Sequence, residues 1–148
     1  MKTTFLIGRI LLGLFLLQSA IGHFSNSAML VGFAASKGVP APEIGVFVSG
    51  LLLLIAAASI ILGYKPVIGV SAMILFFLPV TFMMHAFWTD TGKMAQMNDM
   101  VNFGKNIAIL AASLTMVAIP RPWAFSIESL MNREKSAKNI SVAIGGAR

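Results

Sequence analysis

Four long apolar stretches organise the chain, and short polar segments separate them. They cover about residues 5–24, 44–62, 67–88 and 94–119. None alternates between apolar and polar positions or contains clusters of turn residues, so the pattern favours helices over a β-barrel. At 1.5 Å per residue, each helix is long enough to cross roughly 30 Å of hydrocarbon. The pattern predicts an all-α membrane protein, a bundle of four transmembrane helices.

Turn residues set the expected boundaries between these helices. Residues 63–66 (Gly-Tyr-Lys-Pro) predict a tight turn, which makes the second and third helices antiparallel neighbours. Pro120 and Pro122 end the fourth helix. We therefore divide the chain into a transmembrane domain, residues 1–122, and a basic tail, residues 123–148. A cleaved signal peptide is the weaker interpretation of the first stretch, because Arg9 interrupts it.

Two connecting segments carry apolar residues at helical spacing. In the first loop these are Met29, Leu30, Phe33 and Ala34, and in the tail they are Trp123, Ile127, Leu130 and Met131. Each pattern is typical of a short helix lying in the membrane interface, and the tail adds basic residues that anionic lipid attracts. The last ten residues, 139–148, are expected to be loose.

Composition and charge support a membrane protein and give its orientation. Hydrophobic residues make up 57% of the chain and charged residues 11%, against about 25% charged in soluble domains. The net charge of +6 belongs to membrane-flanking segments, so we expect no nucleic-acid partner. Only Lys37, Lys93 and Lys105 of the Lys and Arg residues fall opposite the termini. The positive-inside rule therefore predicts cytoplasmic N and C termini, in a multi-pass protein of the inner (plasma) membrane.

Several chemistries are excluded by residue content. The chain has no cysteine, which excludes disulfides, cysteine-bound zinc and iron–sulfur clusters formed by this chain alone. No zinc or iron site can be assembled from its carboxylates. We find no Ser-His-Asp arrangement and no phosphate-binding glycine loop, and we identify no catalytic residue.

Polar residues on three helices are expected at a similar height near the outer interface. Helix length arithmetic places His23, His85 and Lys105 there. Asn98, Asn102 and Asn106 share one face of the fourth helix. Asp90 and Asp99 lie towards the outer loop, from which they can reach back to Lys105 or His85. The candidate ligand-binding pocket consists of His23, His85, Trp88, Asn102, Lys105 and Asn106.

Other interpretations of these residues remain open. Each can be an isolated helix-end residue that meets lipid headgroups. Haem ligation by His23 and His85 is less favoured, because no other haem feature accompanies the two histidines. Arg9 is most simply an anchor at the inner interface. A small-residue ridge formed by Gly104, Ala108 and Ala112 predicts packing of the fourth helix against the second, and a homo-oligomer is a further option.

The chain resembles the DoxX family of small four-helix inner-membrane proteins. The residues that carry the resemblance are Gly8–Leu12, Ser19–Phe24, Gly38–Pro42, His85–Trp88, Gln96 and Phe103–Ile109. The resemblance implies a four-helix fold and an association with quinone-linked redox assemblies. This chain departs from the family at His23, where a lysine is common. It also departs at Leu53 and at Ala56–Ala57, where a glutamate and paired glycines are common.

Three functions follow as hypotheses. The first is a membrane subunit of a quinone-linked redox assembly, in which His85, Lys105 and Asn106 donate hydrogen bonds to quinone carbonyls and soluble redox proteins are partners. The second is a non-catalytic membrane scaffold or accessory protein. The third, ranked last, is a small-solute carrier, because four helices leave little room for a pathway.

Overall fold

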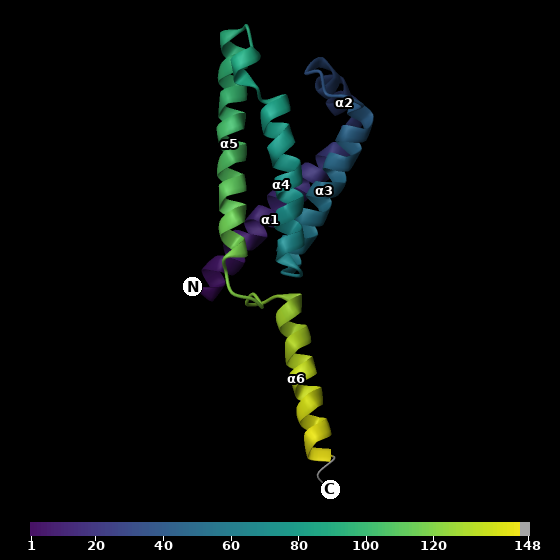
Figure 1. The fold of residues 1–148 in the computed structure, drawn as a ribbon, viewed down its shortest axis with the longest axis vertical. Coiled ribbons are helices and arrows are strands. Elements are labelled where there is room, and N and C mark those ends of the chain that lie inside the picture. Colours follow the sequence, from purple (N-terminus) through teal and green to yellow (C-terminus); the bar gives the residue numbers. More distant parts are fainter. Residues whose placement is uncertain (146–148) are drawn as a thin grey trace.

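The structure, a computed structural model, describes residues 1–145 and is all-α over that range. Its elements are α1 (Lys2–Ser25), α2 (Ser27–Ser36), α3 (Pro42–Leu62), α4 (Pro66–Met84), the 3₁₀ turn η1 (Phe87–Thr89), α5 (Lys93–Val117) and α6 (Ile127–Gly145). Four of these helices, α1, α3, α4 and α5, are long and apolar enough to cross a membrane (Figure 1). The predicted all-α, four-helix membrane protein is therefore confirmed.

The ends of α3 and α4 follow directly from their sequence. Both helices begin with a proline, Pro42 and Pro66, whose fixed φ suits the first helical position. α3 ends at Gly63, which has a left-handed φ of 61°, a conformation that costs glycine little. The predicted tight turn is confirmed, and it makes α3 and α4 antiparallel neighbours.

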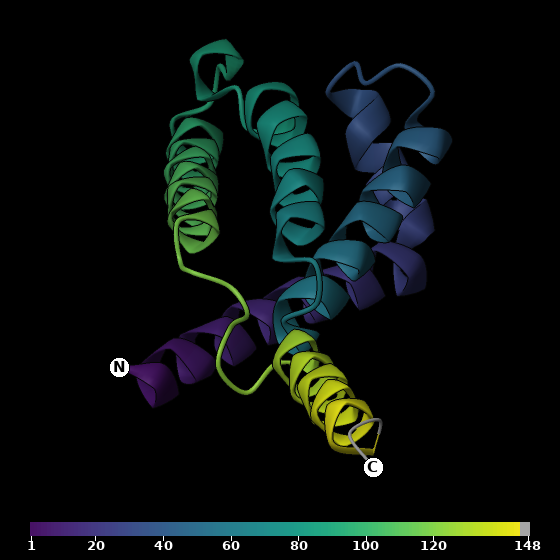
Figure 2. The ribbon, with the colours of Figure 1, turned by 60° about the horizontal axis from the view of Figure 1, so that its bottom comes forward.

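The helices pack mainly in the order α1, α3, α4 and α5 (Figure 2). Leu16, Leu53, Ile60 and Met73 form the centre of the apolar core, and each is almost fully buried. Glycines allow α1 and α3 to approach closely, because a Cβ at Gly13 would collide with Ile61 and one at Gly50 with Phe24. The close contact between these two helices therefore depends on small residues.

The expected packing of the Gly104, Ala108 and Ala112 ridge against α3 is wrong. All three residues are exposed, and a Cβ added at Gly104 would meet nothing within 4 Å. α5 packs instead on α4 and η1. Small residues are common in membrane helices, so their spacing alone does not identify the face that packs.

The loop and tail helices lie at opposite ends of the bundle, which we call the α2 end and the α6 end (Figure 1). The helix expected in the first loop is confirmed as α2, which packs on α3 and α1. The tail is also helical, and α6 projects away from the bundle (Figure 1). Residues 139–145 are helical rather than loose, and residues 146–148 lie outside the described residues.

Arg9 is not an interface anchor as expected, because its side chain is buried, with 1% of its surface exposed. Its Nη2 donates a 2.8 Å hydrogen bond to the Phe125 carbonyl. Its guanidinium carbon lies 5.8 Å from the centre of the Trp123 ring. Arg9 therefore holds the connection between α5 and α6 against α1. This long side chain points into the protein because the folded connection covers it.

Candidate functional site

A cavity of about 610 Å³ opens at the α2 end of the bundle. We call it the α2-end cavity. Its walls come from α1, α2, α3, α4 and α5, and most are apolar side chains such as Phe33, Phe76 and Met83. The polar side chains in its lining are Ser19, His23, Ser49, His85, Lys105 and Asn106. The cavity is thus an apolar space with a few convergent polar groups, the usual character of a small-molecule site.

The structure brings four of the six candidate pocket residues to this cavity, namely His23, His85, Lys105 and Asn106. Trp88 and Asn102 are not among the lining residues. Trp88 packs edge-on against Phe87 and Phe103, with ring centres 5.1 and 5.8 Å apart. Asn102 accepts a 2.8 Å hydrogen bond from Lys105 Nζ. Asn102 therefore positions the lysine, and Trp88 belongs to an aromatic cluster beside the cavity.

The two histidines are held differently. His23 Nδ1 lies 2.8 Å from the Ser19 carbonyl oxygen within α1, and its ring stands edge-on to Phe76. A carbonyl oxygen only accepts hydrogen bonds, so His23 carries a proton on Nδ1. His85 ends α4, and its Nδ1 lies 3.1 Å from Asp99 Oδ1. Both rings therefore leave Nε2 without a partner among the described residues.

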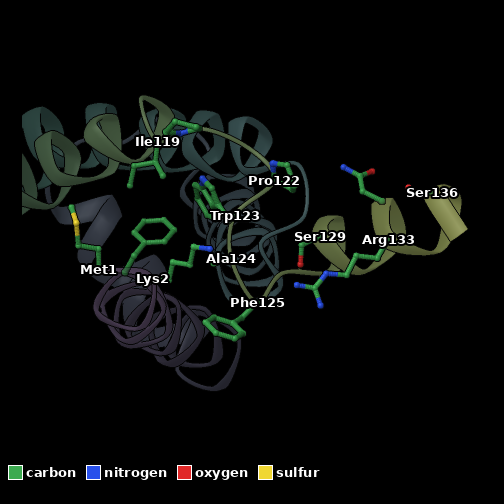
Figure 3. Close-up of a pocket in the computed structure, with 13 residues that line it drawn as sticks. Met1, Lys2, Ile119, Pro122, Trp123, Ala124, Phe125, Ser129, Arg133 and Ser136 are labelled. Atoms are coloured by element: carbon green, nitrogen blue, oxygen red, sulfur yellow. The ribbon is translucent and has the colours of Figure 1, made fainter.

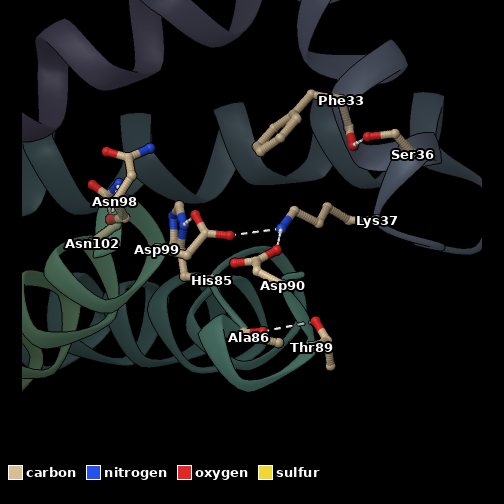
Figure 4. Close-up of polar contacts among 10 residues, drawn as sticks. All are labelled: Phe33, Ser36, Lys37, His85, Ala86, Thr89, Asp90, Asn98, Asp99 and Asn102. Atoms are coloured by element: carbon tan, nitrogen blue, oxygen red, sulfur yellow. Dashed lines mark hydrogen bonds and ion pairs between the residues drawn. The ribbon is translucent and has the colours of Figure 1, made fainter. Parts of the chain in front are cut away.

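His85 belongs to a set of four charged or titratable residues that we call the polar cluster: Lys37, His85, Asp90 and Asp99 (Figure 4). Asp99 lies at its centre. Its Oδ2 accepts a 2.6 Å hydrogen bond from Lys37 Nζ, while its Oδ1 faces His85. Lys37 Nζ also donates a 3.1 Å hydrogen bond to Asp90 Oδ1. The polar cluster therefore joins α2, α4, η1 and α5.

Because the polar cluster is largely buried, water screens its ion pairs little. For the same reason, a charge left there without its partner would destabilise the fold. The Asp99 side chain is 7% exposed and that of Lys37 is 20% exposed. Hydrogen bonds from Lys37 to Asp99 and Asp90 raise the pKa of Lys37 above its ordinary value. With His85 neutral the four side chains sum to −1, and one proton on His85 brings them to zero.

The contacts of Lys37 with Asp90 and Asp99 were not predicted from the sequence. Asp99 lies within α5, six residues after its start at Lys93, inside the predicted fourth helix. It pairs with His85, one of the two partners expected, while the other expected partner, Lys105, binds Asn102. Lys37 is the one Lys or Arg residue in the first loop, and the predicted topology puts it at the same end of the bundle as Asp90. That shared position was the signal that could have paired them.

The shape and lining of the cavity suit a ligand with an apolar body and a polar head. The Asp99 carboxylate orients the His85 ring through Nδ1, so that Nε2 is the nitrogen left for a ligand. Within residues 1–145, no group of three or more His, Asp or Glu side chains is arranged to hold a metal ion.

Fold and site together define a class, a four-helix, multi-pass membrane protein with an apolar cavity that ends beside a histidine–aspartate pair. The DoxX family model matches residues 4–86. Because this match covers more than half of the chain, the protein belongs to the DoxX family. The match begins within α1, ends at Ala86, and so stops before Asp90 and α5. The searches of curated proteins and of solved structures returned no match.

Proposed function

We propose that this protein is the inner-membrane subunit of a quinone-linked redox assembly and that its α2-end cavity binds the quinone headgroup. One observation carries the proposal. His85 lines an apolar cavity while its Nδ1 is held by the buried Asp99. A histidine in that setting is suited to proton exchange with a hydrophobic ligand.

The residues of the cavity fit a quinone. Its volume of about 610 Å³ lies in the roughly 300–1,000 Å³ range of small-molecule sites. Lys105 Nζ and the Asn106 side-chain amide are donors, and quinone carbonyl oxygens are acceptors. Asn106 is buried, so a hydrogen bond from it to a ligand would be shielded from water. The apolar walls from α3 and α4 suit the first part of an isoprenoid tail.

A bound quinone would supply two-electron redox chemistry, and the protein would handle the protons. His85 Nε2 is the nitrogen that accepts a proton from a ligand hydroxyl in the cavity. Asp99 stabilises the resulting imidazolium, and Lys37 holds the Asp99 carboxylate in place. The family's common glutamate is replaced here by Leu53, which is buried in the core. In our proposal the His85–Asp99 pair takes over its acid–base role.

The proposal also implies a partner. The chain contains no cysteine, so it forms no iron–sulfur cluster or thiol pair of its own to carry electrons. The electrons exchanged with the quinone would therefore pass to or from a soluble redox protein bound to this subunit.

Equilibrium binding of a short-tailed quinone to the purified protein tests the proposal. We expect saturable binding, weakened about tenfold by His85→Gln or by Lys105→Gln, since loss of a hydrogen bond involving a charged group costs about 1.5 kcal/mol or more. Gln96→Ala is the matched control, because Gln96 lies on α5 but does not line the cavity. Absence of saturable binding, or equal affinity in all variants, would contradict the proposal.

A specific observation favours a second candidate, a non-catalytic scaffold or accessory protein. The small-residue face of α5 and the basic residues Arg133, Lys135 and Lys138 of α6 are all exposed. Such surfaces suit contacts with another membrane helix or with a partner protein. The organic extract and optical spectrum of gently purified protein distinguish the two candidates, because the scaffold predicts neither quinone nor a haem band.

A further inference from the structure

A second cavity, of about 780 Å³, lies at the α6 end of the bundle (Figure 3). We call it the α6-end cavity. Its walls come from the start of α1, the connection between α5 and α6, and the first turns of α6. Lys2 lines it from α1 and Arg133 lines it from α6. None of the 13 lining residues is acidic. The cavity therefore carries positive charge on two of its walls.

Two residues at this end carry buried donors without partners: Trp123, which lines the cavity, and Arg9, which packs on the Trp123 ring but does not line the cavity. Trp123 lines it with 1% of its surface exposed, and its Nε1 has no hydrogen-bond partner among the described residues. Arg9 lies against the Trp123 ring, and its Nε and Nη1 also lack partners there. Proteins rarely leave buried donors unpaired. The acidic residue in the first turn of α6, Glu128, does not line the cavity, and its Oε2 is also buried without a partner among the described residues. An anion bound in the cavity would balance the charges of Lys2 and Arg133, which line it.

We propose that the α6-end cavity binds the phosphate group of an anionic membrane phospholipid. Lys2 and Arg133, which line the cavity from two sides, contact the phosphate oxygens as charged donors, and the Trp123 ring forms part of the wall beside the lipid. This proposal is independent of the quinone proposal, because the two cavities lie at opposite ends of the bundle and share no lining residue.

The position of the cavity identifies a lipid rather than a free phosphate. Lys2 is the first residue of α1, and Ile119 lies just beyond the end of α5. Both are therefore at the ends of membrane-spanning helices, where lipid headgroups lie. The remaining walls are largely apolar, with Phe5, Ile119 and Pro122 among them. Such walls suit the upper part of acyl chains and offer nothing to a hydrated inorganic ion.

Quenching of Trp123 fluorescence by brominated lipids tests the proposal. Trp88→Phe leaves Trp123 as the single tryptophan of the chain. The protein is placed in phosphatidylcholine vesicles that contain a small fraction of brominated phosphatidylglycerol or the same fraction of brominated phosphatidylcholine. We expect several-fold stronger quenching by the anionic lipid, and we expect Lys2→Gln with Arg133→Gln to abolish the difference.

Matched variants distinguish a specific lipid-binding site from general electrostatic attraction between the basic protein surface and anionic lipid. Lys135→Gln with Lys138→Gln removes the same charge from α6 outside the cavity, and it should keep the preference. Lys2→Arg with Arg133→Lys conserves charge and should also keep it. Equal quenching by both lipids, or loss of the preference in the Lys135–Lys138 pair, would overturn the proposal. Loss of the preference in millimolar inorganic phosphate at constant ionic strength would identify free phosphate as the ligand and overturn the lipid.

Discussion

Lys37 and Asp99, 62 residues apart in the sequence, form an ion pair of 2.6 Å between Nζ and Oδ2. The pair joins the end of α2 to α5, which lie on opposite sides of α4 (Figures 1 and 2). α2 contributes Leu30 and Phe33 to one wall of the α2-end cavity, and α5 contributes Lys105 and Asn106 to another. The ion pair therefore ties together two walls of the cavity.

Removing the lysine charge should loosen this end of the molecule. Lys37→Gln leaves Asp99, which is 7% exposed, without its strongest partner. We expect the free energy of unfolding to fall by about 1–3 kcal/mol, the cost of leaving a buried polar group unsatisfied. Thermal unfolding in detergent would measure the loss. Lys93→Gln is the control, since Lys93 is exposed and should change the stability little.

A double-mutant cycle shows whether that loss comes from the pair. If Lys37 stabilises the fold through Asp99, then Lys37→Gln combined with Asp99→Asn should cost less than the sum of the two single changes. Strict additivity would show that the two side chains act independently and would contradict the structural role given to the pair.

The ionisation of Lys37 should contribute to the pH dependence of the protein's stability. Its pKa is raised in the folded state by hydrogen bonds to Asp99 and Asp90. The stabilisation is therefore fully present below the lysine pKa of unfolded chains, about 10.4, and is lost as pH rises through the higher folded value. Unfolding temperatures of the protein and of Lys37→Gln should converge at high pH. A constant difference across that range would contradict this account.

Two glycines should respond oppositely to alanine. Gly63 has a φ of 61°, and an added Cβ would collide with Arg9 Nη1 and lie 2.6 Å from Ser126 Cβ. We expect Gly63→Ala to destabilise the protein by at least about 1–2 kcal/mol, the cost of the left-handed conformation alone. Gly104→Ala places its methyl group in open space on a helix and should stabilise by up to about 1 kcal/mol. Thermal unfolding compares them directly, and equal effects would contradict the structure.

The sequence predicted the four membrane-spanning helices and the helix in the first loop, because hydropathy and turn residues determine them locally. It also placed His23, His85 and Lys105 at one height, because helix rise alone sets that height. It did not predict which side chains face each other. Lipid and protein interior are both apolar, so hydropathy cannot distinguish the buried Leu53 from the exposed Leu54.

The same limit explains the residues whose roles were wrong or missed. Arg9 is buried because the connection between α5 and α6 folds over it, and nothing in its local sequence indicates that contact. Lys37 reaches Asp99 only because α2 packs back on α3 and α1. Both contacts join segments far apart in the chain, and they depend on helix orientations that a single sequence does not specify.

Single cysteines would test the predicted orientation of the protein. The chain has no native cysteine, and Ser36 and Ser141 are exposed positions near the α2 end and in α6. Because most Lys and Arg residues flank the α6 end, the positive-inside rule places that end in the cytoplasm. In right-side-out membrane vesicles, a membrane-impermeant maleimide should label Ser36→Cys and leave Ser141→Cys unlabelled. Both should react once detergent opens the vesicles, which controls for intrinsic reactivity. The reverse labelling pattern would show that the protein has the opposite orientation. The α2-end cavity would then lie on the cytoplasmic side and the α6-end cavity at the outer leaflet.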